Sequence, residues 1–394
     1  MRKSVCTLAA AMCASAIPVS ADELERLDAA ITGGEPIVDM RYRFESADNQ
    51  VDDRAQASTL RTRLGYETGE YHGFSVLGEL EDLSTIGNNR YHPVDDDYTT
   101  IMDPPDTVLN RAQIDYRGIM GLHATLGRQR IVLDNARHVG DVAWRQNNQT
   151  FDAARLRYGM FGVELDYSHI RKVNAINPDD DDRVDHHLFR ASFDPLDALK
   201  VAYYGFFLDD EDGRESDTHG IDVRGEPRLL DRDWHYRLEF ARQSQDFNGA
   251  EFDPTYLLVQ GGTDVGPLGV TLAHEMLASD GGDAAFQTDL ATKHAFNGWA
   301  DVFLNTPAEG LRDSHVKLDS ELAGVNVALR YHSFASDRGG IDYGDELNLQ
   351  LTRNWGAYTL GAKMARFSAD EIDQVDNTPD DDVDRYWLWA EMKF

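Results

Sequence analysis

Apolar and polar residues alternate with a period of two over much of this chain, and that pattern restricts it to extended strands. The last segment is the clearest case, because Tyr386, Leu388 and Ala390 alternate with Trp387 and Glu391. Successive side chains of a strand point to opposite faces, so such a segment has one apolar and one polar face. The alternation recurs in segments 38–45, 60–67, 111–117, 161–168, 234–241, 325–332 and 358–365.

Alternation occurs in soluble β-sandwiches and in membrane barrels, so the number of strands and their chemistry decide between them. We count about 17 to 19 candidate strands, more than one soluble sheet usually carries. Their polar faces are charged, which suits the wall of a water-filled interior, and their apolar faces often end in an aromatic residue. We predict an all-β fold, a transmembrane antiparallel up-and-down β-barrel of about 18 strands, with 16 as the alternative because bacterial barrels favour even numbers.

The chain begins like an exported protein. Arg2 and Lys3 precede a run of apolar and small residues that ends at Ala21. That run is shorter than the roughly 20 residues of a membrane-spanning helix, so we predict a signal peptide over residues 1–21, with Sec-type export and cleavage before Asp22. A lipoprotein with Cys13 as the lipidated residue is the alternative. Cys6 and Cys13 are the two cysteines of the chain, so the mature protein is expected to contain no disulfide.

The remainder of the chain divides into a short tail and one barrel. Leu24, Leu27 and Ile31 recur at helical spacing, which predicts a periplasmic helix or tail over residues 22–34. Residues 35–394 form the predicted barrel, since no linker interrupts them. The chain ends on Phe394, and a terminal aromatic residue on an alternating strand resembles the signal that the barrel-assembly machinery recognises. The predicted location is the outer membrane of a Gram-negative bacterium, in contact with lipid and lipopolysaccharide.

Charge and motifs exclude several classes of function. The net charge of −32 argues against nucleic acid as a partner. Acidic runs such as 179–182 and 380–382 are typical of solvated loops and none has the spacing of a calcium-binding EF-hand, so we assign no metal and no cofactor. Neither a Gly-x-Ser-x-Gly nor a His-Glu-x-x-His motif occurs, and we predict no enzymatic activity. The histidines His186, His187 and His219 are expected at the surface.

Arginines nevertheless occur repeatedly on the predicted polar faces. Two interpretations are compatible: they favour anions in a pore, or they pair with acids of the wall and stiffen it. The predicted pore-lining residues are Arg41, Arg43, Arg61, Arg63, Arg111, Arg128, Arg130, Arg137, Arg145, Arg155, Arg157, Arg237, Arg330 and Lys363.

Three stretches carry a family resemblance. They are 59–66, with Thr59-Leu60-Arg61-Thr62-Arg63; 127–153, with Gly127-Arg128-Gln129-Arg130-Ile131 and Trp144-Arg145-Gln146; and 290–313, with Phe296-Asn297-Gly298-Trp299. Together they resemble the alginate-export porin family of Gram-negative outer membranes. The resemblance implies an 18-stranded barrel with an arginine-rich constriction, to which Arg61, Arg63, Arg128, Arg130, Arg155 and Arg157 correspond by motif. Arg137 and Arg145 correspond to an adjoining loop that folds inward.

The sequence therefore predicts an outer-membrane porin with an aqueous, arginine-lined channel. The expected solutes are anionic, such as alginate, its oligomers or other acidic saccharides and small anions, moved by export or by uptake. The alternative is a structural or adhesive barrel with a plugged lumen and acidic outer loops that bind cations.

Overall fold

The computed structural model describes residues 20–370 and 381–394, apart from 197, 212 and 248. The predicted signal peptide, with both cysteines, lies almost entirely outside the described residues. Its cleavage after Ala21 stays a prediction.

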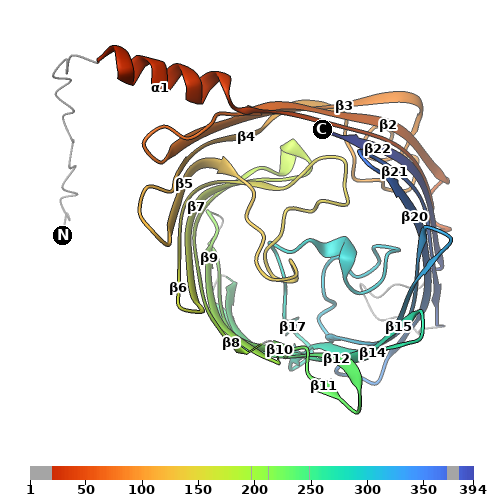
Figure 1. The fold of residues 1–394 in the computed structure, drawn as a ribbon. Helices are drawn as coiled ribbons and strands as arrows, with labels where there is room; N and C mark the ends of the chain where they lie inside the picture. The colour runs from red at the N-terminus through yellow and green to blue at the C-terminus, as the bar shows by residue number, and fades with distance from the viewer. Residues whose placement is uncertain (1–19, 197, 212, 248, 371–380) are drawn as a thin grey trace, which may run out of the picture.

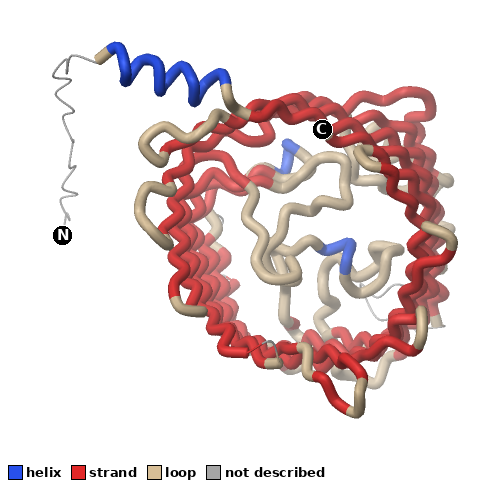
Figure 2. Tube along the Cα trace, viewed as in Figure 1, coloured by secondary structure: helices blue, strands red, loops and turns tan. Residues whose placement is uncertain are grey.

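Eighteen long strands form one closed antiparallel barrel, which confirms the predicted fold class and strand number (Figures 1 and 2). Each strand pairs with the next along the chain, and the first pairs with the last, Tyr42 opposite Ala390, so the sheet has no free edge. The strands are β1 (Glu35–Asp48), β2 (Ala55–Glu67), β3 (Phe74–Arg90), β4 (Asp106–Tyr116), β5 (Leu122–Gln129), β6 (Thr150–Met160), β7 (Val163–Asn174), β8 (Asp182–Leu196), β9 (Leu199–Asp209), β10 (Arg214–Gly225), β12 (Arg232–Phe247), β14 (Thr255–Val265), β15 (Leu268–Leu277), β18 (Leu311–Leu322), β19 (Val325–Ala335), β20 (Asp342–Trp355), β21 (Tyr358–Ala369) and β22 (Val383–Lys393).

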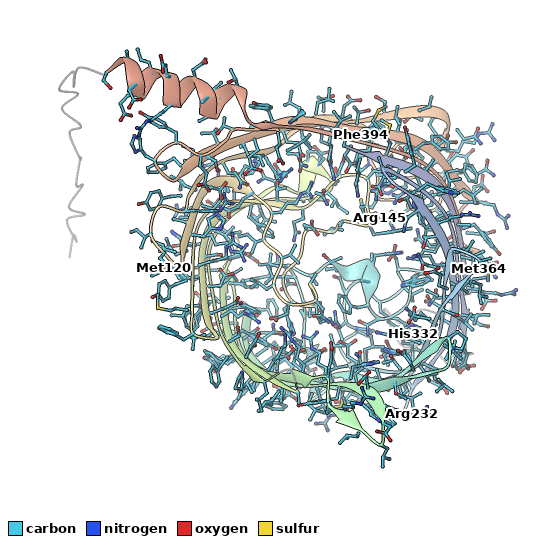
Figure 3. All side chains as sticks on the ribbon, viewed as in Figure 1. Met120, Arg145, Arg232, His332, Met364 and Phe394 are labelled. Carbon is cyan, nitrogen blue, oxygen red and sulfur yellow. The ribbon has the colours of Figure 1, made fainter. Side chains whose placement is uncertain are left out.

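The alternation along each strand separates the two faces of the wall. On β22, Tyr386 and Leu388 are exposed on the outer face, whereas Trp387 between them is buried on the inner face. Figure 3 shows the same contrast, with Met364 outside the ring of strands and Arg145 inside it. Leu388 is 57% exposed and Leu64 is 56% exposed, values that suit contact with lipid rather than with a protein core.

The two ends of the barrel differ in the length of their connections. One end, here called the turn end, has tight connections such as 161–162 and 323–324; the other, the loop end, has long ones such as 91–105 and 130–149. Helix α1 (Ala21–Thr32) precedes β1 at the turn end and lies outside the ring (Figure 1). Ser20 caps the start of this helix, because its hydroxyl accepts a hydrogen bond from the amide of Glu23. Within the described part of the chain, no helix is long and apolar enough to cross a bilayer.

Two segments from the loop end fold back into the barrel, where Figure 2 shows them as loops crossing the ring. The first inner loop is residues 130–149, and the second inner loop is residues 286–310. The second contains the 3-10 turn η2 (Lys293–Ala295) and follows the small hairpin of β16 (Ser279–Asp280) and β17 (Ala284–Ala285). Three further short elements, η1 (Pro178–Asp180), β11 (Arg228–Leu229) and β13 (Ala250–Phe252), lie in connections. Apolar residues of the inner loops, including Ile131, Val139 and Phe303, form a core with the inner wall.

Candidate functional site

Four arginines lie on the inner faces of two neighbouring strands. Arg41 and Arg43 are on β1 and Arg61 and Arg63 on β2, and the register places Arg41 directly opposite Arg61. All four are buried. Because alternate residues of a strand share a face, the pattern Arg-x-Arg on each strand gathers four guanidinium groups on one patch of wall.

Carboxylates of the same wall neutralise part of this charge. Arg61 donates to Asp39, with 2.6 Å between nitrogen and oxygen, and lies 3.3 Å from Glu391 of β22. Arg63 forms an ion pair with Glu81 of β3. Pairing of this kind is required of charges held away from bulk water, and it supports the interpretation that these arginines stiffen the wall.

A β-bulge adds another arginine to the patch. The pairing of β3 with β4 shifts so that Asn110 is an extra residue and Arg111 lies opposite Glu79. Arg111 makes two hydrogen bonds to the carboxylate of Glu79, at 3.0 and 2.7 Å. Arg130, at the start of the first inner loop, lies 3.5 Å from the same carboxylate.

These side chains line a cavity of about 360 Å³ near the turn end, here called the basic cavity. Among the described residues, six basic and three acidic side chains line it: Arg41, Arg61, Arg63, Arg111, Arg130 and Lys393, with Asp39, Glu79 and Glu391. The lining therefore has an excess of positive charge, even though the whole chain is strongly acidic.

Two of these arginines show the excess of positive charge most directly. Arg41 makes no ion pair within the described part of the chain; it donates to Gln146 at 2.7 Å and to backbone carbonyls of the first inner loop, among them Trp144 at 3.2 Å. Burial, together with the positive charges of Arg63 and Arg111, lowers the pKa of Arg130 to about 10. Both observations indicate a positive potential in the basic cavity. A pKa of about 10 still leaves Arg130 protonated at neutral pH.

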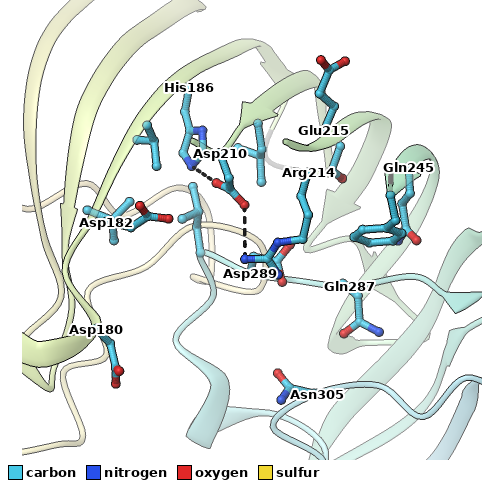
Figure 4. A pocket seen from close by; sticks show the side chains of 16 residues that line it. Asp180, Asp182, His186, Asp210, Arg214, Glu215, Gln245, Gln287, Asp289 and Asn305 are labelled. Atoms are coloured by element: carbon cyan, nitrogen blue, oxygen red, sulfur yellow. Dashed lines mark ion pairs between the residues drawn. The ribbon is translucent and has the colours of Figure 1, made fainter. Parts of the chain in front are cut away.

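A second cavity, near the loop end, has the opposite charge. This acidic cavity has a volume of about 460 Å³ and is shown in Figure 4. Its charged lining among the described residues is Asp180, Asp182, Asp210, Glu215 and Asp289, with Arg214. His186 also lines it and lies 3.5 Å from Asp210. The prediction that His186 is a surface residue is wrong, because its parity on β8 turns it into the lumen, where it is buried.

The first inner loop is bound to opposite sides of the barrel. Asp134 accepts two hydrogen bonds from Arg190 of β8, at 2.8 and 2.7 Å. Arg137 donates to Glu275 of β15 at 2.7 Å. Farther along, the loop meets the arginines of β1, where Arg43 donates to the Trp144 carbonyl. Charge-assisted bonds at both ends hold the loop across the lumen.

The second inner loop is bound to the first and to the wall. Arg145 pairs with Asp301 and with Glu45 of β1, and these carboxylates raise the pKa of Arg145 despite its burial. Glu346 of β20 accepts from the backbone amide of Ala300 at 3.0 Å. The two inner loops therefore form one unit that narrows the lumen.

A lysine joins this unit to β21. The Lys363 ammonium lies 4.0 Å from the ring centre of Trp144 and 3.8 Å from that of Trp299, one from each inner loop. It donates to Nε2 of His294 at 2.7 Å, and the Nδ1–H of that ring donates to Asp301. Burial lowers the pKa of His294 to about 3, so the ring stays neutral and keeps Nε2 free to accept. Cation–π contacts of a desolvated lysine are worth about 2 kcal/mol.

The structure distributes the predicted pore-lining residues over several places. Arg41, Arg61, Arg63, Arg111 and Arg130 meet in the basic cavity. Arg43, Arg137, Arg145 and Lys363 hold the inner loops. The others on the inner face pair separately along the wall: Arg155 with Asp166, Arg157 with His123, Arg237 with Asp222 and Arg330 with Asp319.

Arg128 differs from the rest. It shares its strand face with Leu126, which is 62% exposed, and so lies on the outer face of β5. There it donates to both oxygens of Asp152, at 2.7 and 3.0 Å. We therefore leave Arg128 out of the proposed pore lining. The sequence prediction also missed Glu79, Glu391 and Lys393, although the alternation of β3 and β22 was enough to place them on inner faces.

Comparison with known proteins agrees with this geometry. The chain is similar to the porin OpdO of Pseudomonas aeruginosa, with a TM-score of 0.71 and 15% identity over 93% of this chain and 99% of that one. It is also similar to OpdK of the same species with vanillate (TM-score 0.70, 14% identity, 92% and 99% covered) and to OccAB1 of Acinetobacter baumannii (0.66, 14%, 93% and 98%). The fold is that of an outer-membrane porin of Gram-negative bacteria.

The sequence itself identifies the family. The sequence model of the alginate export family matches residues 36–251, more than half of the chain. The protein belongs to that family, as the resemblance in its motifs predicted. No relative is found among curated protein sequences.

Proposed function

We propose that this protein is an aqueous outer-membrane channel for anionic solutes, with acidic saccharides such as alginate or its oligomers as the substrate class. The excess of basic side chains in the basic cavity is the observation that carries the proposal. Rings of arginine or lysine favour anions in a pore. No catalytic step is part of this proposal.

The proposal includes an orientation. Outer-membrane barrels have short periplasmic turns and long extracellular loops, so we infer that the turn end, with the basic cavity, faces the periplasm. An anion leaving the periplasm would then meet the basic cavity first and the acidic cavity last. A passive channel conducts in both directions, so the concentration gradient decides between export and uptake.

Measurement of ion selectivity in a planar bilayer tests this proposal. The informative variant is Arg41→Gln with Arg130→Gln, because Arg41 has no ion pair among the described residues and Glu79 keeps Arg111 when Arg130 is neutralised. Two unit charges about 8 Å from a permeating ion contribute roughly 0.4 kcal/mol after screening at physiological salt. Since this favours anions and disfavours cations equally, we expect the anion-to-cation permeability ratio to fall about three- to fourfold.

The control is Arg128→Gln, which removes one arginine charge on the outer face, where Arg128 pairs with Asp152. Its permeability ratio is expected to equal that of the unaltered protein. Equal ratios in the double variant and in the unaltered protein would contradict the proposal. Heat-modifiable migration on a gel shows for each variant that the barrel has folded.

The alternative function, a structural or adhesive barrel with a plugged lumen, has one observation in its favour. The inner loops share a continuous apolar core with the wall, including Phe286 and Phe303. A folded barrel without measurable conductance in the bilayer would support this alternative.

A further inference from the structure

Three potential metal ligands stand together on the outside of the barrel. His169 of β7 lies directly opposite His187 of β8, and Asp185 is two residues from His187 on the same face. These residues form the outer-face cluster. Their side chains are 32%, 43% and 53% exposed, respectively. The cluster lies on the loop-end side of Tyr167 and Phe189, where the aromatic part of the outer face gives way to polar side chains.

The ligand atoms of the cluster converge. The Nε2 atom of His169 is 2.7 Å from Oδ1 of Asp185, and Nε2 of His187 is 3.9 Å from the same oxygen. All three ligand atoms lie within 4.8 Å of one another. Tetrahedral zinc at its usual bond lengths separates its ligands by about 3.3 Å. Movements of up to about 0.8 Å for each ligand atom, with the two parallel rings tilting towards the ion, would bring the three atoms to that separation.

The ring of His187 is already held in place from behind. Its Nδ1 atom lies 2.8 Å from the hydroxyl of Tyr167, which leaves Nε2 directed at Asp185. The two imidazole rings are parallel, with 4.6 Å between their centres. Metal-ligating histidines generally use their second nitrogen in such a bond, which fixes the orientation of the ring.

A second tyrosine–histidine pair on the outer face lacks the other two ligands and so allows a comparison. On β9 and β10, the Tyr203 hydroxyl lies 2.8 Å from Nδ1 of His219, in an arrangement like that of Tyr167 and His187. His219 belongs to neither of the two metal-type groups found among the described residues. The tyrosine–histidine pair is therefore a recurring feature of the outer face, and His169 with Asp185 is what distinguishes the outer-face cluster.

We propose that His169, Asp185 and His187 bind one divalent transition-metal ion of the zinc class on the exterior of the barrel. Two imidazoles and one carboxylate suit zinc, whereas calcium and magnesium prefer oxygen ligands throughout. The exposed side of the cluster leaves the remaining coordination position to water. The bound ion joins β7 to β8 just beyond the aromatic residues of the outer face.

The second histidine–aspartate group of the described residues does not share these properties. Asp313, His315 and His332 lie in the lumen, and both histidines direct Nδ1 at the one carboxylate, at 3.1 and 3.0 Å. Asn297 of the second inner loop also donates to Asp313, at 3.3 Å. The whole group is buried and Asn297 binds it, so the group acts as an attachment for the second inner loop.

A zinc titration of the full chain tests the proposal. The protein is stripped with a chelator in detergent, and ZnCl₂ binding is measured by calorimetry. Changing a residue that only orients a metal ligand typically weakens metal affinity roughly 10- to 100-fold, so loss of a side chain that binds the ion is expected to weaken it at least as much. We therefore expect His169→Ala and His187→Ala each to weaken the tightest site at least tenfold, and His219→Ala to leave it unchanged. Zinc is also expected to raise the temperature of the heat-modifiable gel shift in the unaltered protein but not in His187→Ala.

One further variant guards against a folding defect. Arg171 lies 3.3 Å from Asp185 and is 67% exposed, so it competes with a metal ion for this carboxylate without being part of the core. Arg171→Gln is expected to bind zinc more tightly. Absence of a zinc site in the unaltered protein overturns the proposal, and so does equal affinity in His187→Ala and His219→Ala.

Discussion

The basic cavity and the acidic cavity lie in one lumen but have opposite charge. The basic cavity is lined mainly by side chains of strands, such as Arg41, Arg61 and Arg111. The acidic cavity takes much of its charge from connections and strand ends at the loop end, such as Asp180 and Asp289. The negative net charge of −32 therefore comes more from the loops than from the wall. The local field at the wall depends on which face of a strand each charged residue occupies.

The largest expected effect comes from removing most of the first inner loop, which crosses the lumen. Replacing residues 133–146 of the first inner loop with a short Gly-Ser linker would remove one of the two segments that narrow the lumen, and 18-stranded barrels are wide enough to hold an aqueous channel. We expect single-channel conductance to rise roughly threefold or more, whereas the strand arginines of the basic cavity keep the two ends different in charge. The matched control replaces residues 50–53, an exposed connection of the loop end, in the same way; unchanged conductance in the inner-loop variant would show that this loop does not limit the pore.

Removing a negative charge from the basic cavity is expected to have the opposite effect on ion selectivity to removing its arginines. Glu79→Gln removes the carboxylate that accepts from Asn110, Arg111 and Arg130. The excess positive charge should then grow, and we expect the anion-to-cation permeability ratio to rise about twofold. Because the variant leaves the partly buried guanidinium groups of Arg111 and Arg130 without their carboxylate, the barrel should also unfold at a lower temperature. A lower permeability ratio would count against the positive potential inferred for this cavity.

The smallest effect is expected at the loop end. Asp180→Asn with Asp289→Asn reduces the negative charge of the acidic cavity, which is open to solvent and salt. We expect the current to become more nearly equal at positive and negative voltage in 0.1 M KCl, and this change to disappear in 1 M KCl, where the Debye length is about 3 Å. A change of equal size at both salt concentrations would point to altered structure rather than altered field.

Much of the barrel could be predicted from the sequence because its determinants are local. The alternation of Tyr386, Leu388 and Ala390 with Trp387 and Glu391 requires knowledge of neighbouring residues alone, and it fixed the faces of β22 correctly. Arg128 shows the limit of that reasoning. Its motif neighbour Arg130 faces the lumen, but Leu126 on the same strand face as Arg128 already indicated lipid contact.

The inner loops could not be predicted in the same way. Arg137 and Glu275 are separated by 138 positions. Lys363, Trp144 and Trp299 come from three distant parts of the chain, and the lysine contacts both tryptophan rings in the lumen. Neither periodicity nor composition encodes such pairings. The family resemblance did suggest an infolded loop for Arg137 and Arg145, yet it could not say which wall residues hold it.

Because the first inner loop is attached to both sides of the wall, the width of the barrel and the width of the passage through it are determined by different parts of the chain. Strand pairing determines the circumference of the barrel, whereas the first inner loop, together with the second, determines how far the lumen is narrowed. Changes of sequence in these loops can therefore alter which solutes pass through the lumen without disturbing insertion of the barrel into the membrane. One barrel architecture is thereby able to serve a whole set of permeation specificities.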